Sequence, residues 1–525
     1  MAETRPIDAA AGDRSHRPRG PAWLGAAIGI VVGGTALGVA HLVAGLANPE
    51  ASPFVAVGET AIDASPEWLK AWAIRTFGQA DKAVLLLGIG VVLATIAVAL
   101  GIASMRRRWV ALAGLLALGA VGVLTALTRP DAVPGDAIPT LAGVAVGALV
   151  LGLLRRSASL DEPPPPREMP RAFDRRRFLI AAGGGAVAAV VAGGAGALLG
   201  RSARASASRA DVTIPDPVSP ASPRAAVGPD VPGLEPFHTP NDRFYRVDTA
   251  LLVPSVEAEG WELRVRGMVE RELRLDYRRL LARPLIERDI TLACVSNPVG
   301  GPYVGNARWV GAPLRDLLEE AGVRPGADQL VSRSVDGFTI GTPTAAVMDG
   351  RDAMLAVAMN GEPLPLEHGF PVRMVVPGLY GYVSAMKWLV ELELTTFAAY
   401  DAYWVQRGWA EQAPIKTMSR IDTPTGSKTV RAGRVPIAGV AWAQHRGIER
   451  VEVRVDDGAW MEVELSEEGT IDTWRQWAAT WDATPGEHRL QVRATDADGV
   501  TQPEERAEPF PSGATGWHAV VVQVA

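Results

Sequence analysis

The sequence predicts a chain of three parts: transmembrane α-helices at the N-terminus, an α+β domain and a C-terminal β-sandwich. Long apolar runs without charge occupy the first two hundred residues. From residue 235 onward, short strands and helices mix without a regular βαβ repeat, which favours an α+β domain. After about residue 410 only short strand-like segments occur. A length of 525 residues fits three such parts, at about 100–200 residues per domain.

The composition excludes several classes of protein. The chain has 52 Lys and Arg against 58 Asp and Glu, a net charge of −6, so we expect no nucleic-acid partner. A single Cys excludes a disulfide framework and a Cys-based zinc site. Apolar residues make up 48% of the chain and the mean hydropathy is +0.11, which is high for a soluble protein. The apolar runs account for this excess.

Five runs lack charged side chains and are each long enough to cross about 30 Å of hydrocarbon. They are residues 22–47, 83–104, 109–128, 137–154 and 178–200. Buried helices of a large soluble core are the alternative, but five runs without a polar face argue against it. We therefore predict a membrane region with four helices at residues 1–160 and a fifth membrane helix at 174–201.

Basic residues predict the orientation of these helices. Arginines cluster at positions 14–19, 106–108 and 155–156, and alternating helices place all three clusters on one side. The positive-inside rule makes that side cytoplasmic, so the fifth helix delivers the rest of the chain outside. Residues 174–179 (DRRRFL) resemble a twin-arginine export signal, a route for folded proteins, with ordinary flanking charges as the alternative. We expect a multi-pass protein of the cell membrane with extracytoplasmic domains.

Two stretches rich in Pro, Ala and Ser are expected to be extended linkers. They are residues 157–171 and 202–234. They leave residues 235–410 as the predicted α+β domain and 411–525 as the predicted β-sandwich. Within the first of these, strands are expected at 261–267, 375–377 and 387–394, and short helices at 277–282 and 314–321.

The C-terminal segment shows short strands at 8–12-residue spacing, which is typical of an immunoglobulin-like β-sandwich. The expected strands are residues 435–443, 449–455, 460–465, 489–494 and 518–524. Turn signals at 456–458 (DDG) and 496–499 (DADG) separate some of them. Without cysteines, the core of this sandwich is expected to rest on Trp442, Trp474, Trp477 and Trp481.

The single cysteine, Cys294, lies where a strand runs into a Gly/Pro turn, in residues 291–301 (TLACVSNPVGG). A lone Cys is usually a small buried apolar residue. A cysteine protease would need a His and an orienting partner, and the spacing nominates neither. What distinguishes Cys294 is the series that follows it. The series is 305–314 (GNARWVGAPL), 360–365 (NGEPLP), 368–373 (HGFPVR), 377–381 (PGLYG) and 387–388 (KW).

This ordered series resembles the sulfite oxidase family of molybdopterin-dependent oxidoreductases. The resemblance extends from about residue 241 to the C-terminus, where the sandwich resembles the family's Mo-co dimerisation domain. It implies a sulfite-oxidase-type molybdopterin domain with a Mo-molybdopterin cofactor. It also implies that Cys294 is the metal ligand and a catalytic residue, since a soft thiolate suits molybdenum already held by two dithiolene sulfurs.

The same resemblance implies the cofactor contacts. His368 and Arg373 match the family's His-Gly-x-Pro-x-Arg motif, and Lys387 matches a Lys that precedes Trp. The further candidates for cofactor binding are Asn241, Tyr245, Arg246, Ser334, Asp336 and Ser384. Arg246 is in addition a candidate catalytic residue.

Two departures from the family pattern leave the substrate open. Residues 297–301 (NPVGG) hold no cation where animal and plant sulfite oxidases carry an arginine, although Arg246 and Arg407 could contribute charge. The aromatic residues at 400–409 do not match the spacing of the family's catalytic tyrosine. We therefore expect oxo transfer to or from a small sulfur compound, either sulfite or a sulfoxide.

The partners follow from what the sequence lacks. It contains no C-x-x-C-H haem motif, and His41 is the single histidine in the apolar runs, so we expect an electron carrier of quinone or cytochrome type outside this chain. The leading helices are expected to be an anchor, with a docking surface for a redox partner as the alternative, and the dimerisation-type domain predicts a homodimer.

Two other functions fit the sequence less well. A non-catalytic cell-surface binding protein with a degenerate molybdopterin fold is disfavoured by the set of Cys294, His368 and Arg373. A transporter is disfavoured because the four leading apolar runs carry no intramembrane charge.

Overall fold

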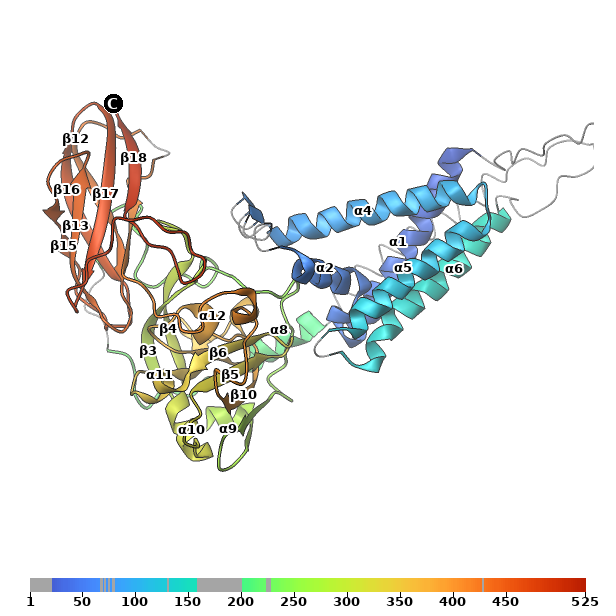
Figure 1. The fold of residues 1–525 in the computed structure, drawn as a ribbon, viewed down its shortest axis with the longest axis horizontal. Coiled ribbons are helices and arrows are strands. Elements are labelled where there is room, and N and C mark those ends of the chain that lie inside the picture. Colours follow the sequence, from blue (N-terminus) through green and yellow to red (C-terminus); the bar gives the residue numbers. More distant parts are fainter. Residues whose placement is uncertain are drawn as a thin grey trace, which may run out of the picture. The chain divides into compact units, whose positions relative to one another are not determined.

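The computed structural model describes residues 21–66, 69, 72–73, 76–77, 81–129, 132–157, 201–222, 228–426 and 429–525. The chain divides into two compact units, Met1–Ala203 and Arg204–Ala525 (Figure 1). The fifth apolar run, the DRRRFL motif and most of the proline-rich linker lie outside the described residues.

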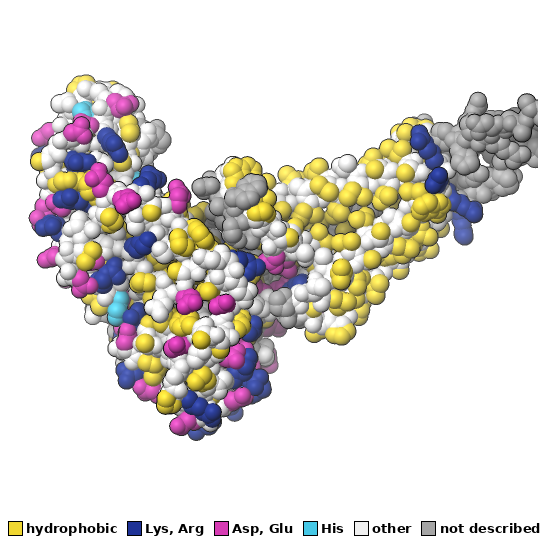
Figure 2. Space-filling model, in the orientation of Figure 1, with side chains coloured by type: hydrophobic (Ala, Val, Ile, Leu, Met, Phe, Trp, Pro, Cys, Tyr) yellow, Lys and Arg dark blue, Asp and Glu magenta, His cyan; other side chains and the backbone are white. Residues whose placement is uncertain are grey.

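The first unit contains the four long helices expected from the apolar runs. They are α1 (Ala22–Ala47), α4 (Asp81–Ser104), α5 (Trp109–Leu127) and α6 (Ile138–Ser157). All four are long and apolar enough to cross a membrane. Figure 2 shows that apolar side chains cover much of their visible surface. A short helix that the sequence did not predict, α2 (Pro53–Ala64), lies between the first two.

Small residues bring the helices of this unit into close contact. A β-carbon on Gly29 of α1 would lie 2.0 Å from the carbonyl oxygen of Ala97 in α4. One on Gly143 of α6 would lie 2.3 Å from the carbonyl oxygen of Ala36. Backbones can approach this closely only without side chains between them, as is common where membrane helices pack.

The two described arginine clusters lie at the same end of the bundle. Arg155 Nη1 donates a hydrogen bond of 3.5 Å to the carbonyl oxygen of Ser104, directly before residues 106–108. Met105 packs with Leu24 at the start of α1. Polar contacts hold the chain together beyond the far end of α1, where Asn48 Nδ2 donates to Asp136 Oδ1 at 3.1 Å.

The α+β part of the second unit contains two sheets. The first has the order β2-β1-β10-β5-β6 and the second the order β3-β4-β7-β8, with β9 paired to β7. The strands are β1 (Glu262–Gly267), β2 (Leu273–Asp276), β3 (Ile286–Ala293), β4 (Val304–Pro313), β5 (Gln329–Ser334), β6 (Thr339–Pro343), β7 (Met354–Met359), β8 (Glu362–Pro363), β9 (Arg373–Val375) and β10 (Leu389–Thr395). The helices are α8 (Arg201–Asp211), α9 (Tyr277–Leu281), α10 (Leu314–Ala321), α11 (Thr344–Met348) and α12 (Gly381–Ser384), with the 3-10 turns η4 (Leu366–His368) and η5 (Val405–Arg407).

The elements predicted in this domain are largely confirmed. The strands at 261–267 and 387–394 and both short helices occur within two residues of their expected bounds. The strand expected at 375–377 was misplaced, since β9 ends at Val375. Pro377 has no N–H to donate to a neighbouring strand, so the ladder ends before it.

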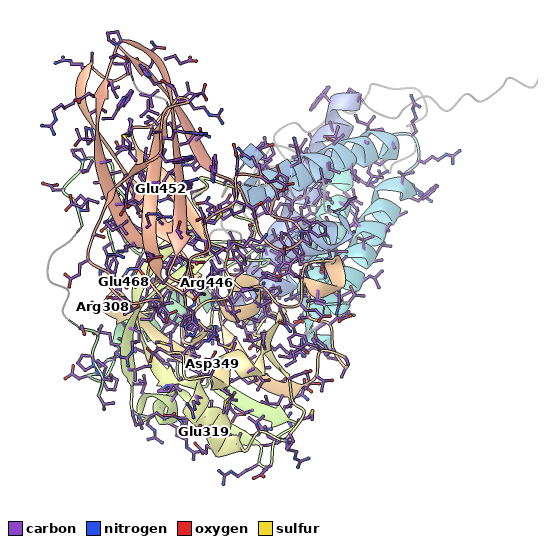
Figure 3. The ribbon with its side chains drawn as sticks, turned by 60° about the vertical axis from the view of Figure 1, so that its left-hand side comes forward. Arg308, Glu319, Asp349, Arg446, Glu452 and Glu468 are labelled. Carbon is purple, nitrogen blue, oxygen red and sulfur yellow. The ribbon has the colours of Figure 1, made fainter. Side chains whose placement is uncertain are left out.

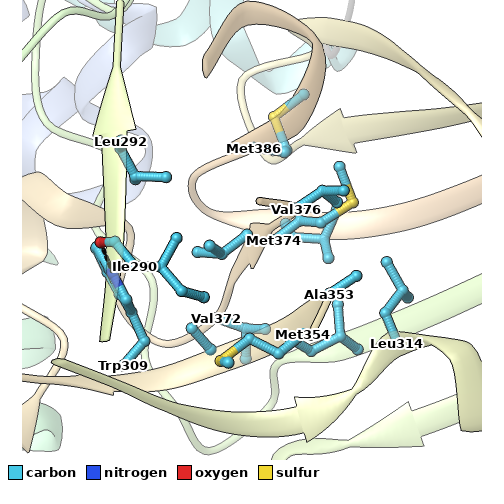
Figure 4. Packing of buried hydrophobic residues seen from close by; sticks show 14 of the residues in the cluster. Ile290, Leu292, Trp309, Leu314, Ala353, Met354, Val372, Met374, Val376 and Met386 are labelled. Carbon is cyan, nitrogen blue, oxygen red and sulfur yellow. Dashed lines mark hydrogen bonds between the residues drawn. The ribbon is translucent and has the colours of Figure 1, made fainter. Parts of the chain in front are cut away.

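A continuous apolar core fills the space around the second sheet (Figure 4). Trp309 on β4 is fully buried, and its Nε1 donates to the carbonyl oxygen of Ile290 on β3 at 3.1 Å. Met354 on β7 and Met374 on β9 are also buried in this core. The strand that leads to Cys294 is therefore rigidly packed.

The C-terminal part is a sandwich of two four-stranded sheets, as predicted. Their orders are β11-β12-β16-β15 and β14-β13-β17-β18. The strands are β11 (Met418–Thr423), β12 (Gly433–Trp442), β13 (Ile448–Val455), β14 (Met461–Glu462), β15 (Glu464–Leu465), β16 (Arg475–Ala483), β17 (Gly486–Asp496) and β18 (His518–Val524). The single strand expected at 460–465 is instead split into β14 and β15, one in each sheet.

The expected tryptophan core of the sandwich was half wrong. Trp477 and Trp481 do lie in the sandwich core. Trp442 and Trp474, by contrast, belong to the buried core of the α+β domain. Trp474 Nε1 donates to the carbonyl oxygen of Phe237 at 3.0 Å, so this ring is drawn out of the sandwich toward the preceding domain.

The sandwich is joined to the α+β domain by polar and aromatic contacts. Arg446, labelled in Figure 3, forms an ion pair of 3.0 Å with Asp496 inside the sandwich and donates to the carbonyl oxygen of Ile415, a residue of the α+β core. The loop before β18, dark red in Figure 1, brings Phe510 to 5.3 Å from Trp409, measured between ring centroids.

Candidate active site

Cys294 follows directly after β3, at the strand end that the sequence predicted. Its side chain is buried and is not in a disulfide. Its amide donates to the carbonyl oxygen of Tyr303 at 2.9 Å, and its Sγ lies 2.9 Å from Ser296 Oγ. Burial raises the pKa of the thiol, and this effect outweighs the hydrogen bond with Ser296 and the charge of Lys387.

The turn after Cys294 has a shape that requires glycine. Gly300 adopts φ +75°, and a β-carbon there would lie 2.1 Å from the ring of His518 in β18. The side chain of Asn297 closes the turn by accepting a hydrogen bond from the Tyr303 amide at 2.9 Å. Arg420 Nη1 donates to the carbonyl oxygen of Gly301 at 3.1 Å. The sandwich therefore braces this turn from outside.

The sandwich also braces β3 itself. Thr291 is buried, its amide donates to the carbonyl oxygen of Asp472 at 2.9 Å, and its carbonyl accepts from Gln444 Nε2 at 3.1 Å. Its hydroxyl accepts from the Trp474 amide at 2.7 Å and donates to Asn306 Oδ1 at 3.0 Å. These bonds fix the strand three residues before the cysteine.

His368 ends the turn η4 and is buried. Its Nε2 lies 2.9 Å from the carbonyl oxygen of Asn241, which can only accept, so Nε2 carries the proton and Nδ1 is an acceptor. Burial lowers the pKa of His368 to about 4, with the charges of Arg373 and Lys387 acting in the same direction. The ring is therefore neutral at pH 7.

Arg373 begins β9 and is buried as a cation. Its guanidinium lies 4.9 Å from the Trp309 ring centroid, and its Nη1 donates to the carbonyl oxygen of His368 at 3.2 Å. Burial lowers the pKa of Arg373 to about 10, so it is still charged at pH 7. Its Nε is buried without a hydrogen-bond partner in the described part of the chain.

Lys387 and Arg246 share one carboxylate. Asp248 Oδ2 accepts from Lys387 Nζ at 2.7 Å and from Arg246 Nε at 2.7 Å. The Asp248 side chain is only 5% exposed. Burial lowers the pKa of Lys387 to about 8, although the charge of Asp248 and its hydrogen bond raise it.

Gly369 allows these groups to gather, and Gly381 lies beside them. A β-carbon on Gly369, which has φ +107°, would lie 3.0 Å from Lys387 Cβ and 3.2 Å from Arg373 Cβ. A β-carbon on Gly381 would lie 3.6 Å from the carbonyl oxygen of Ala293 and 3.8 Å from the hydroxyl of Tyr245. Burial raises the pKa of Tyr245, and the charge of Cys294 adds to that rise. Tyr245 and the cysteine turn thus share one site with the cations.

Other expected contact residues are bound to the protein itself. The Ser384 hydroxyl, at the end of α12, donates to the carbonyl oxygens of Leu379 and Tyr380, which directly precede that helix. The Asn241 side chain donates to Glu362 at 2.5 Å, so the part of Asn241 that touches the site's histidine is its carbonyl. Asp336 accepts from the Phe338 amide in the turn after β5. The hydroxyl of Ser334, at the end of β5, is buried without a hydrogen-bond partner among the described residues.

Sequence reasoning missed Asp248 and the role of Trp309. Asp248 lies two residues after Arg246, and alternate residues of an extended segment share a face, so the Arg-x-Asp spacing was a usable signal. Trp309 lies inside the motif at 305–314, but no local pattern indicates that Arg373 stacks on it.

The charge of the site fits an anionic ligand. Arg246, Arg373 and Lys387 are cations and Asp248 is an anion, while His368 is neutral, which leaves two positive charges. A phosphate group carries about −1.5 to −2 charge at pH 7. In the described residues, no three His, Cys, Asp or Glu side chains are grouped so as to hold a metal ion.

The chain is similar to known families and proteins. Residues 250–404 match the family described as oxidoreductase molybdopterin binding domain, and residues 411–525 match the Mo-co oxidoreductase dimerisation domain. The chain is 30% identical to sulfite oxidase of Gallus gallus, over 54% of this chain and 72% of that protein. It is 34% identical to YuiH, an uncharacterised oxidoreductase of Bacillus subtilis, over 28% of this chain and 72% of that protein.

Some relatives are matched over less of their length. The chain is 30% identical to mitochondrial sulfite oxidase of Drosophila melanogaster, over 52% of this chain, and spans 56% of that protein's length. It spans 62% of the mitochondrial sulfite oxidase of Rattus norvegicus. Among solved structures, the sulfane dehydrogenase SoxCD from Paracoccus pantotrophus is matched with a TM-score of 0.49 and 25% identity, over 56% of this chain and 84% of that one.

Proposed function

Because the chain belongs to the sulfite oxidase family of molybdopterin-dependent oxidoreductases, we propose that it is a membrane-anchored enzyme acting outside the cytoplasm on a small sulfur compound. The reaction is the transfer of an oxygen atom to or from that compound, of the sulfite or sulfoxide class. The main support is the buried free thiol of Cys294 at the end of β3, with buried cations gathered beside it.

The cofactor of this family is Mo-molybdopterin, and the residues present fit it. The buried Arg373 Nε and Ser334 Oγ have no partner within the described chain, which leaves both free to bond a bound group, since buried polar groups in native structures are nearly always hydrogen-bonded. Two net positive charges suit the phosphate of the cofactor. We assign the metal bond to Cys294 and the cofactor contacts to Arg373, Lys387, His368 and their neighbours.

The bound cofactor supplies a molybdenum centre that exchanges an oxygen atom and two electrons with the substrate. Oxidation of sulfite adds an oxygen from water to sulfur, which gives sulfate and releases two protons and two electrons. Reduction of a sulfoxide breaks the S–O bond, consumes two protons and two electrons, and releases the oxygen as water. A carrier of cytochrome or quinone type takes up or supplies the electrons.

The side chains prepare the site for this chemistry by position and charge. The Cys294 amide is hydrogen-bonded to the carbonyl oxygen of Tyr303. Thr291 in β3 is hydrogen-bonded to the sandwich, which fixes the strand. The neutral His368 offers Nδ1 as an acceptor, while Arg373 and Lys387 offer N–H donors on the same side of the domain. A preorganised donor set of this kind binds an anionic cofactor with little rearrangement.

We infer that the first unit anchors the enzyme with its arginine end in the cytoplasm. The arginines at 106–108 and 155–156 lie at one end of four helices long enough to cross a membrane, which supports this orientation. The fifth run and the DRRRFL motif would then carry the second unit outside. The match of residues 411–525 to a dimerisation domain supports a homodimer.

Metal analysis of the purified full-length protein tests this function. We expect about one molybdenum per chain, and activity with sulfite or dimethyl sulfoxide in the presence of an artificial electron carrier. Cys294→Ser should abolish turnover, whereas Ser296→Ala, which keeps the thiol, should retain the metal. Full activity with serine at position 294 would refute the site. A wild-type protein without molybdenum would favour the non-catalytic binding protein instead.

A further inference from the structure

Asp248 places a negative charge among the cations of the candidate site. Its carboxylate accepts from Arg246 Nε and Lys387 Nζ, each at 2.7 Å, and a second contact from Arg246 Nη2 measures 3.4 Å. Its side chain is 5% exposed, and that of Lys387 is 12% exposed. Ion pairs this well buried are weakly screened by solvent, so the carboxylate acts on any charge brought into the site.

The same arrangement recurs at the turn that follows Cys294. Arg420, which donates to the carbonyl oxygen of Gly301, also donates from Nε to Asp422 at 2.6 Å. Both arginines are thus paired with an acid two residues later. The turn at 295–301 itself contains no cation.

The position of Asp248 relative to Cys294 follows from the packing of Lys387. Lys387 lies against Gly369 and Arg373, and its charge acts directly on the Cys294 thiol. Arg246 directly follows Tyr245 in the chain. The Tyr245 hydroxyl lies near Gly381, and Gly381 lies near the carbonyl oxygen of Ala293. Asp248 thus binds one cation on the cofactor side of the site and one on the side of Tyr245.

We propose that Asp248 is a specificity-determining residue, which holds Arg246 and Lys387 in ion pairs and thereby favours uncharged sulfur substrates over anionic ones. This inference rests on the proposed function and names its substrate class more closely. Sulfite brings negative charge to the site, whereas a dialkyl sulfoxide is neutral and offers only an acceptor oxygen. A fixed carboxylate in the site disfavours an anionic substrate relative to a neutral one, by on the order of tenfold where the two charges lie several ångströms apart.

The test uses the full-length protein loaded with its cofactor, in wild-type form and as Asp248→Asn. Asp352→Asn is the matched control, because it removes the same charge from an ion pair with Arg288 at 2.8 Å on the same domain. The readouts are molybdenum per chain, the dissociation constant of sulfate by calorimetry, and KM for sulfite and for dimethyl sulfoxide.

We expect the dissociation constant of sulfate to be about tenfold lower in Asp248→Asn than in wild type. The KM for sulfite should fall by about the same factor. KM for dimethyl sulfoxide should change less than about twofold, and the control variant should match wild type throughout. Asp248→Glu, which keeps the charge, should retain the wild-type preference. Unchanged sulfate affinity in a fully loaded Asp248→Asn protein overturns the inference.

The outcomes separate this inference from the proposed function. Loss of molybdenum from Asp248→Asn but not from Asp248→Glu would assign the carboxylate to cofactor retention, and the specificity role would be overturned. A wild-type protein that holds no molybdenum would overturn the proposed function instead. Because sulfate binding is measured directly, the charge effect is tested even if neither sulfur compound is turned over.

Discussion

Gly300 is the residue at which the turn after Cys294 meets the sandwich. We expect Gly300→Ala to lower the free energy of unfolding by about 3 kcal/mol, because a β-carbon there is strained by the left-handed backbone and would also meet the His518 ring at 2.1 Å. Gly361→Ala is the control, since Gly361 has φ +85° but no atom within 4 Å. It should lose only about 1 kcal/mol.

Denaturant unfolding in detergent measures both variants, and molybdenum analysis accompanies it. Gly300→Ala should also lose part of its metal, because the displaced turn begins at Cys294. Equal stability losses in the two variants would show that the contact with His518 contributes nothing.

His518 makes stability depend on pH. Burial lowers the pKa of His518 to about 4, and the charges of Arg420 and Arg506 act in the same direction. Its Nδ1 accepts from the Ile421 amide at 3.0 Å, a bond that only the unprotonated nitrogen can accept. The folded-state pKa lies below the unfolded value of about 6.5, so stability is full above pH 6.5 and falls as the pH drops toward 4.

Between pH 7 and pH 5 we therefore expect wild type to lose about 1 kcal/mol more than His518→Gln, after allowance for partial exposure of the ring. Urea titrations at the two pH values measure the difference. Parallel losses in both proteins would mean that His518 is not the titrating group.

At this scale the sequence was informative where residues form ordered motifs. Cys294, His368 and Arg373 were identified as a set by the resemblance, and the structure brings His368, Arg373 and Lys387 together. Whether each of them binds the cofactor is still a prediction. Asp248 was missed because single acidic residues are common on loops, and its role becomes visible only when Lys387, far along the chain, is placed beside it.

At the scale of elements, β3 depends on hydrogen bonds from the sandwich. Thr291→Val keeps the shape of the side chain but leaves the Trp474 amide and Asn306 Oδ1 without their shared partner. We expect a loss of about 3 kcal/mol in the free energy of unfolding, since each buried polar group left unsatisfied costs about 1–3 kcal/mol. The strand end at Cys294 should shift, so molybdenum content should fall as well.

Thr495→Val is the matched control inside the sandwich, because it removes one buried hydroxyl that bonds Thr501 at 2.9 Å. It should lower stability by about 1 kcal/mol and leave molybdenum content unchanged. Metal loss in both variants would mean that general destabilisation, rather than the position of β3, controls cofactor retention.

Elements with a strong local pattern were predicted well, and those defined by distant partners were not. The four apolar helices and strand β18 matched because composition and spacing alone specify them. The short helix α2 has no such pattern. Trp442 and Trp474 were assigned to the wrong core. They lie at or next to strand ends, and the local sequence there does not indicate which domain covers a buried ring, since only tertiary contacts decide that.

For the whole molecule, the separation into two compact units predicts independent responses to mutation. We expect Gly29→Leu to destabilise the first unit, because any β-carbon there would overlap the backbone of α4 at Ala97. Gly34→Leu is the control, since Gly34 is exposed and has no atom within 4 Å. Thermal aggregation in detergent should begin at lower temperature for the first variant only.

Molybdenum content and oxo-transfer activity should be the same in both glycine variants, because the site residues all lie in Arg204–Ala525. Loss of metal from Gly29→Leu alone would show that the two units are energetically coupled.

The three-part plan of the chain could be predicted from composition, since hydropathy separates membrane from globular segments. The splitting of the sandwich tryptophans between two cores could not.

The hydrogen bond from the Trp474 amide to the hydroxyl of Thr291 joins residues 183 positions apart. During synthesis, the strand behind Cys294 emerges from the ribosome long before its partners do. Its amide and hydroxyl stay exposed to water until the last quarter of the chain has been translated and has folded. A truncated product would thus carry the Cys294 thiol on a strand that lacks its hydrogen bonds to the sandwich. The metal centre can therefore mature only when translation is nearly complete.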